Sequence, residues 1–398
     1  MQKIIFLVDM NAFYISCEMT RNPLLIGKPA AVAGDPKKRK GIILAANYEA
    51  RAFGVKTAMT LYEALKHCAD MVVVPPDHPF YSEKSKAVMQ LLSNYTPVVE
   101  QNSIDEAWLD MTGTEKLFGN AKDTAKSIMC EIKDSLGLWC SIGISENKFL
   151  SKMAADMKKP LGITTLFRED IATKLWPLPV KAMYGVGSKT AEKLNHLGVQ
   201  TIEQLAKYDR KHLIKALGKC GDEIYLHANG IDPAPVIPRA EDDIKSIGRS
   251  VTLSEDLSDL DNAKLILMRL SDEVSSIARK HNKKGRTVQI TLKYTDFTTI
   301  TRQTTIPKTY LAKTIYATGA MLLTNNWCSY RPIRLIGITL TGFDDSDIAQ
   351  LSLFEIAQAY VPDEEEKIEK TIDSIREKYG TDKVGWAALM KKENKFNE

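Results

Sequence analysis

The chain has 398 residues, of which 44% are hydrophobic and 26% are charged, a composition typical of a globular protein with about two to four domains. Its net charge of +4 is unevenly spread, because residues 245–343 carry 15 Lys or Arg against 7 Asp or Glu, whereas residues 344–398 carry 8 against 14. No apolar run reaches the roughly 20 residues that span a bilayer, and the first residues lack the pattern of a secretory signal. These features exclude a membrane protein and favour a cytoplasmic one whose basic module faces a polyanion.

The first 166 residues alternate between strand-like and helix-like patterns. Strands are expected at 4–8, 30–34, 42–46, 71–75 and 139–145, and helices at 15–19, 60–68, 79–92, 121–136 and 147–157. Interleaved strands and helices with antiparallel neighbours indicate an α+β sheet domain.

Acidic residues stand where two of the apolar segments begin or end. The first strand ends at Asp9, and residues 98–109 form an apolar segment that contains the adjacent acids Asp105 and Glu106. If the two segments are neighbouring strands, three carboxylates converge at one sheet edge, and such oxygen ligands suit Mg²⁺. Strict alternation would send Asp105 and Glu106 to opposite faces, so a shared site requires a turn or bulge. The alternative is that these acids are solvated strand ends.

The pattern becomes helical between residues 178 and 230. It contains Gly185-Val186-Gly187, followed by a helix start that includes Lys189. This arrangement is typical of a helix-hairpin-helix, in which glycines let backbone N–H groups face a phosphate. A plain turn between two helices is the alternative. The Pro-rich residues 232–238 then predict a stiff linker.

The basic module has the order strand, helix, strand, strand, helix, strand, at 245–253, 259–281, 287–294, 298–306, 310–327 and 333–343. This order predicts a compact split-βαβ unit. Residues 279–286 are its densest run of positive charge, and they are either phosphate contacts that read no bases or a charged, soluble loop. Residues 362–390 form a charged helical pattern interrupted by Gly380, which is either a docking helix or partly disordered.

Taken together and in this order, the motifs resemble a Y-family DNA polymerase. The matching segments are 8–10 with 13–14, 48–51, 103–106, 147–148, 154–162, 185–187 and 246–249. The resemblance implies a right-hand α+β fold with palm (1–10 and 77–166), fingers (11–76), helical thumb (167–233), linker (234–244), split-βαβ little finger (245–343) and acidic tail (344–398). It also implies template-directed addition of deoxynucleotides to a primer 3′-hydroxyl, with error-prone translesion synthesis past DNA damage and no proofreading.

The resemblance also assigns roles to individual residues. Asp9, Asp105 and Glu106 match the carboxylates that hold two Mg²⁺ ions (Mn²⁺ being the alternative), and the backbone carbonyl of Met10 joins them. The residues that match nucleotide contacts are Phe13, Tyr14, Tyr48, Arg51 and Lys159, with Tyr14 as the steric gate against ribonucleotides. Those that match DNA contacts are Gly185, Gly187, Lys189, Ser246, Arg249 and Arg331. Tyr14 as a core aromatic and Lys159 as a solvated helix end are the alternatives.

The acidic tail contains a segment similar to the bacterial sliding-clamp-binding peptide. Gln350, Leu351, Leu353 and Phe354 supply the glutamine and apolar side chains that fill a groove on such a partner. A segment packed on its own domain is the alternative. The expected partners are therefore primer-template DNA, deoxynucleoside triphosphates and a sliding clamp, bound by a monomer.

The sequence leaves two other functions open. A catalytically inactive, polymerase-like adaptor that binds DNA and the clamp would be expected to lack one of the three acids, and all three are present. A palm-fold nucleotide cyclase would leave the hairpin and the basic module without a purpose.

Overall fold

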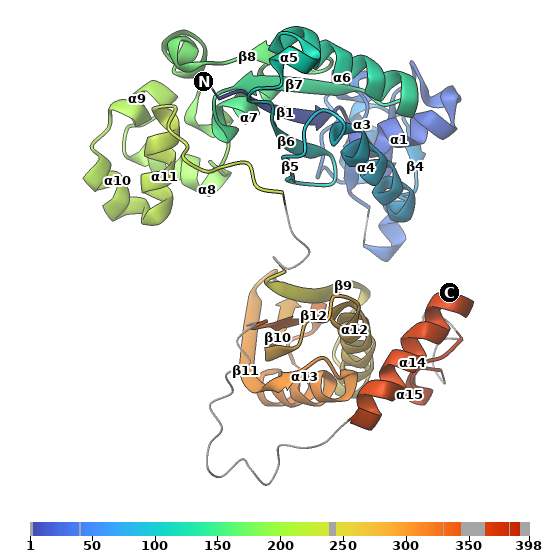
Figure 1. The fold of residues 1–398 in the computed structure, drawn as a ribbon. Helices are drawn as coiled ribbons and strands as arrows, with labels where there is room; N and C mark the ends of the chain where they lie inside the picture. The colour runs from blue at the N-terminus through green and yellow to red at the C-terminus, as the bar shows by residue number, and fades with distance from the viewer. Residues whose placement is uncertain are drawn as a thin grey trace. The chain divides into compact units, whose positions relative to one another are not determined.

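The structure is a computed structural model that describes residues 3–39, 41–238, 244–328, 330–343, 363–381 and 383–390. The chain divides into two compact units (Figure 1), which are Met1–Pro36 with Gly41–Arg239 and Lys37–Lys40 with Ala240–Glu398. The boundary falls within residues 234–244, the predicted linker. Among the described residues, no helix is both long and apolar enough to cross a membrane. Each unit mixes sheet and helix, so the predicted α+β class is confirmed.

Unit 1 is built on a five-stranded sheet of order β5-β6-β1-β7-β8. Its central strand β1 (Ile5–Met10) runs antiparallel to both neighbours, β6 (Glu106–Asp110) and β7 (Cys140–Ser145). The outer strands are β5 (Val99–Gln101) and β8 (Ile163–Thr165). Every residue of β1 is buried, which explains why its sequence is apolar without alternation up to Asp9.

Helices cover both faces of this sheet. The alternate residues Phe6 and Val8 pack into a core with α4 (His78–Leu92) and α6 (Ala121–Leu136), whereas Leu7 packs on the opposite face with α7 (Lys148–Met157). This alternation places every second residue of β1, including Asp9, on the α7 face.

Helix α7 lies unusually close to β7 because residue 143 is glycine. A Cβ added at Gly143 would lie 2.0 Å from the backbone oxygen of Ser151 and 2.4 Å from the backbone nitrogen of Ala155. No side chain fits at these distances, so the close approach of α7 depends on this glycine.

The rest of unit 1 forms two smaller parts, each with its own apolar core. The first contains a three-stranded sheet, and its elements are β2 (Ala30–Ala33), β3 (Ile43–Ala46), α2 (Tyr48–Ala52), α3 (Leu61–His67) and β4 (Val72–Val74). Helix α1 (Phe13–Arg21) precedes it and packs into the core of the five-stranded sheet. The second is helical, with α8 (Ser188–His196), α9 (Ile202–Lys207), α10 (Arg210–Leu217) and α11 (Lys219–Ala228). A short helix, α5 (Glu115–Phe118), precedes α6.

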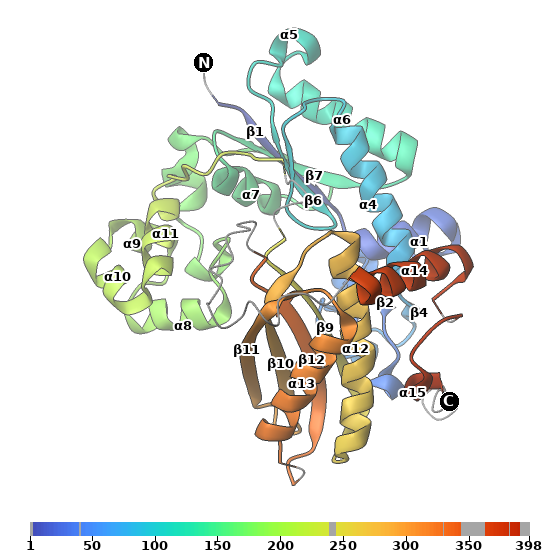
Figure 2. The same ribbon diagram turned by 60° about the horizontal axis from the view of Figure 1, so that its bottom comes forward.

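Unit 2 contains a four-stranded antiparallel sheet of order β11-β10-β12-β9, in agreement with the predicted split-βαβ order. Its elements are β9 (Ser246–Leu257), α12 (Leu260–Lys280), β10 (Gly285–Tyr294), β11 (Thr299–Thr309), α13 (Ala312–Asn326) and β12 (Ile333–Thr341). Helices α12 and α13 cover one face of the sheet (Figure 2), and their apolar side chains share a core with the strands. The opposite face is open, and α14 (Asp363–Tyr379) and α15 (Ala387–Met390) follow.

Candidate active site

Asp9 and Glu106 meet at one end of the central sheet. They are directly opposite each other in the antiparallel pairing of β1 and β6. Both point to the α7 face, since each bonds to the same lysine of α7, Lys152. The prediction that the two segments are neighbouring strands is therefore confirmed.

Asp105 lies just before β6, where the chain bends over residues 103–105. Its backbone oxygen accepts a hydrogen bond from Met10 N at 2.9 Å, and its carboxylate accepts one from Ser103 Oγ at 2.5 Å. The bend is the departure from strand alternation that a site shared with Glu106 requires. Among the described residues, no three Asp, Glu, His or Cys side chains are gathered closely enough to hold a metal ion, so the shared metal site stays a prediction.

Two lysines compensate the buried acids. Lys152 Nζ lies 2.9 Å from Asp9 Oδ2 and 2.5 Å from Glu106 Oε2. Lys159 Nζ lies 2.8 Å from Asp9 Oδ2 and 2.8 Å from Asp156 Oδ1. The side chains of Lys152, Asp9 and Glu106 are only 11%, 10% and 12% exposed, so water screens these charges little.

The pKa values of these groups reflect a balance between burial and charge. Burial is the largest influence on Asp9, but Lys152 and Lys159 outweigh it and hold its pKa below the usual range. Burial raises the pKa of Glu106, and the nearby charge of Asp9 adds to this effect against the opposing Lys152. Burial disfavours the ammonium of Lys152, but the surrounding carboxylates outweigh it and raise its pKa. The carboxylates therefore keep the Lys152 side chain in its charged ammonium form.

In chemical kind the donor atoms at this end of the sheet suit a hard divalent cation, although no three acidic side chains among the described residues are gathered around one point. Carboxylate oxygens from Asp9, Asp105 and Glu106 are the ligands that Mg²⁺ prefers. Two ammonium groups already lie against the carboxylates of Asp9 and Glu106, so the site accommodates concentrated positive charge.

Tyr48 carries a buried hydroxyl that has no hydrogen-bond partner among the described residues. It begins α2, which is capped by the Asn47 side chain. Burial raises the pKa of Tyr48, and the positive charges of Arg51 and Lys159 act in the opposite direction. Arg51 is oriented by a 2.8 Å hydrogen bond from its Nε to Ala46 O. A buried donor beside two cations has the chemistry of an anion site.

Phe13 and Tyr14 begin α1 and differ in their surroundings. Phe13 is buried in the core, whereas Tyr14 is half-buried and stacks on Tyr81 with ring centroids 4.5 Å apart. Burial raises the pKa of the Tyr14 hydroxyl, and the charge of Asp105 adds to the shift. Tyr14 therefore lies within electrostatic reach of the acids.

Two residues of this site were not predicted from the sequence. Lys152 is a charged residue within a helix segment that is otherwise apolar or small, Phe149–Ala155, and this isolated charge was the available signal. Asn11 is buried, and it donates from Nδ2 to Ser141 Oγ at 3.0 Å and accepts from Leu161 N at 2.9 Å. It thereby ties the end of β1 to the loop after Lys159, a role that no sequence pattern indicated.

The predicted DNA contacts fall on exposed positions in both units. Gly185 has φ of +88° and is followed by Gly187 at the start of α8, and both glycines and Lys189 are exposed. Ser246 lines the open sheet face of unit 2. Arg249 is half exposed, with Nε 3.8 Å from Glu273 of α12.

The Arg331 side chain already makes contacts within unit 2. Arg331 donates to Asp296 Oδ2 at 3.0 Å and lies over the Tyr294 ring at 3.9 Å.

The predicted clamp-binding residues Gln350, Leu351, Leu353 and Phe354 lie outside the described residues.

Comparisons with known proteins decide the family. A model described as the impB/mucB/samB family matches residues 8–156, the family's C-terminal domain matches 244–353, and the IMS family HHH motif matches 168–199. DNA polymerase IV of Clostridium kluyveri is 58% identical over 98% of this chain and 99% of its own length. The chain belongs to the DNA polymerase IV group of the Y-family DNA polymerases.

Two further similarities agree. DNA polymerase IV 1 of Bacillus subtilis is 43% identical over 98% of this chain and 94% of its own length. The solved Y-family DNA polymerase chimera Dbh-Dpo4(243-245)-Dbh superposes with a TM-score of 0.76 and 27% identity, covering 85% of this chain and 99% of that one. Membership confirms the prediction of a template-directed, translesion DNA polymerase, an enzyme of a metal-dependent family.

Proposed function

We propose that the acidic end of the central sheet is the polymerase centre and that Asp9, Asp105 and Glu106, with the carbonyl of Met10, bind two divalent ions. Mg²⁺ is the expected ion, with Mn²⁺ as the alternative, because the donors are all hard oxygens. When bound, such a pair activates the primer 3′-hydroxyl and stabilises negative charge on the reacting phosphates. The primer-template DNA and deoxynucleoside triphosphates are the substrates.

The observation that carries this proposal is the unpartnered hydroxyl of Tyr48. A buried donor left without an acceptor costs about 1–3 kcal/mol, and a triphosphate oxygen would remove that cost. The guanidinium of Arg51 and the ammonium of Lys159 add charge at the same place, so the three side chains would orient the triphosphate and neutralise it. Phe13 and Tyr14 would then border the sugar, with Tyr14 excluding a 2′-hydroxyl.

The remaining residue assignments follow the family resemblance. We propose that the hairpin of Gly185 and Gly187, with Lys189, contacts the DNA backbone, and that Ser246, Arg249 and Arg331 add contacts from unit 2. We also propose that the chain divides into palm, fingers, thumb and little finger at the predicted boundaries, and that residues 350–354 bind a sliding clamp. In this proposal the protein acts as a monomer in the cytoplasm.

Primer extension with one substituted acid tests the assignment. Asp105→Asn keeps the size of the side chain and removes its charge, and we expect it to lower the extension rate at least 100-fold with Mg²⁺ present. Asp110→Asn is the matched control, because Asp110 lies at the other end of β6, opposite Ile5. Full activity of Asp105→Asn, or equal losses in both variants, would contradict the proposed centre.

A further inference from the structure

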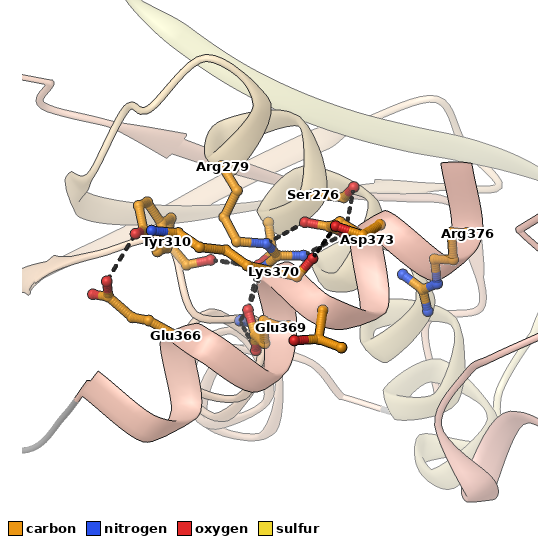
Figure 3. A network of polar contacts seen from close by, with 12 residues as sticks. Ser276, Arg279, Tyr310, Glu366, Glu369, Lys370, Asp373 and Arg376 are labelled. Carbon is orange, nitrogen blue, oxygen red and sulfur yellow. Dashed lines mark hydrogen bonds and ion pairs between the residues drawn. The ribbon is translucent and has the colours of Figure 1, made fainter. Parts of the chain in front are cut away.

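Helix α14 is attached to the helix-covered side of unit 2 by a buried arginine (Figure 3). Arg279 of α12 donates from Nε to Asp373 Oδ2 at 2.5 Å, and its Nη1 pairs with Glu369. Glu369 also accepts from the backbone nitrogen of Ala312, at the start of α13, at 3.0 Å. Only 3% of the Arg279 side chain is exposed, because α14 covers it on one side and Ser275 and the backbone oxygen of Tyr310 also lie against its guanidinium.

Two further cations of the basic module are paired with the same helix. Lys284, just before β10, bonds to Glu366 at 2.5 Å, and Lys313 of α13 bonds to Glu365 at 2.9 Å. The phenolic hydroxyl of Tyr310 also donates to Glu366 at 2.8 Å. Four acids of α14 therefore meet three cations that belong to α12, to the loop that follows it and to α13.

Apolar packing plays a small part in this attachment. Among the described residues, the apolar core of unit 2 includes no side chain of α14, and Ile368 of α14 is 59% exposed. A helix held mainly by ion pairs is expected to loosen as salt screens them.

Two of the paired cations belong to a feature that the sequence already shows. Arg279 and Lys284 belong to residues 279–286, the densest basic run in the chain, for which phosphate contact and a soluble loop were both open. Two carboxylates around one guanidinium resemble the arrangement of phosphate oxygens around an arginine. Lys284 and Lys313 remain 41% and 70% exposed beside α14, so the helix neutralises these two by ion pairing and buries only Arg279. Without α14, the three cations would form a second, unneutralised phosphate-binding surface, on the opposite side of the sheet from the open face.

We propose that α14 is a built-in anionic ligand that occupies this second cationic surface and so confines DNA to the open sheet face of unit 2. The open face is lined by polar and basic residues, among them Ser246, Thr291, Lys293 and Thr339. With α14 docked, the module keeps its positive charge where the sheet can contact a DNA backbone. The docked helix α14 thereby limits unproductive binding of DNA to the helix-covered side of unit 2.

The proposed role of α14 can be tested by measuring non-specific DNA binding. The test variant is Glu369→Gln/Asp373→Asn, which removes the charge of both carboxylates paired with Arg279, and the matched control is Glu364→Gln/Glu377→Gln, which removes two exposed acids from the same helix. A fluorescein-labelled duplex of arbitrary sequence is titrated by anisotropy over a series of KCl concentrations, without nucleotide or divalent metal. Because no chemistry is involved, failure of the proposed catalytic centre would leave this result unaffected.

We expect the test variant to bind the duplex about tenfold more tightly at low salt, and the slope of log K against log salt to steepen by up to about 2.7, or 0.9 for each of three new phosphate contacts. The control should stay within twofold of the parent. Adding Arg279→Met to the test variant should remove most of the gain, and circular dichroism checks that all variants remain folded. Equal gains in test and control variants, or no gain in either, would overturn the proposal.

Discussion

Replacement of Lys152 by methionine should make the stability of unit 1 depend on divalent metal. The ammonium of Lys152 lies between Asp9 and Glu106, and all three side chains are close to nine-tenths buried. Removing one partner of a buried ion pair costs about 3–5 kcal/mol. Lys159 remains 2.8 Å from Asp9 and offsets part of the loss, so we expect about 3 kcal/mol without metal.

The expected loss is large enough to measure by thermal melting. For a unit of this size, 1 kcal/mol shifts the melting temperature by about 2–4 °C, so Lys152→Met should melt about 6–12 °C below the parent in EDTA. A divalent cation bound by the same acids would replace the missing charge. At a concentration 100 times its dissociation constant, such an ion contributes about 2.7 kcal/mol, which would cancel most of the deficit.

Lys148→Met is the matched control for this experiment. Lys148 is on the same helix, and its Nζ bonds to both oxygens of Glu100 at 2.8 Å, with both side chains similarly buried. Its substitution should lower the melting temperature by the same amount with EDTA and with Mg²⁺. If Lys152→Met shows equal deficits under the two conditions, then Asp9 and Glu106 do not bind the metal, and the charge-replacement reasoning fails.

Three other substitutions test separate parts of the site. Tyr48→Phe removes the unpartnered hydroxyl, so it should raise the melting temperature of the free protein and raise the KM for deoxynucleotides about tenfold, as loss of a hydrogen bond to a charged group predicts. Tyr14→Ala should raise ribonucleotide incorporation relative to deoxynucleotides in single-nucleotide extension, and an unchanged ratio would remove Tyr14 from the gate. Gly143→Ala forces α7 away from β7 and should destabilise unit 1 by about 1–3 kcal/mol in thermal melts, whereas Gly187→Ala, where an added Cβ meets nothing, should not.

Much of the fold could be predicted from the sequence because its elements have strong local patterns. The helix expected at 121–136 has those bounds in the structure, where Asn120 caps its start and Gly137 ends it. The order of elements in unit 2 was also predicted correctly, and the clearest signal is β10, in which buried apolar residues alternate with polar ones. The short strand Ile163–Thr165 was missed, because three residues carry too little periodicity to be recognised.

The site was predictable to the extent that its residues form motifs. Asp105 and Glu106 are adjacent acids in an apolar segment, so the free-energy cost of burying them could be recognised from the sequence alone. Lys152 and Asn11 act through contacts with residues about 50 to 150 positions away, and such pairings arise only from the register of β1, β6 and β7. Asn11 in particular looks like an ordinary polar residue after a strand.

The basic run at 279–286 illustrates why charge density along a sequence does not by itself locate accessible positive charge. Arg279 and Lys284 of this run contact an acidic helix some 80 to 90 residues further along the chain, and Arg279 is nearly inaccessible. Lys293, in contrast, stands alone in the sequence but lines the open face of the sheet. Accessible charge, and not the number of cations per segment, sets the electrostatic contribution to DNA affinity. An acidic segment that follows a basic module should therefore be considered first as a ligand of that module.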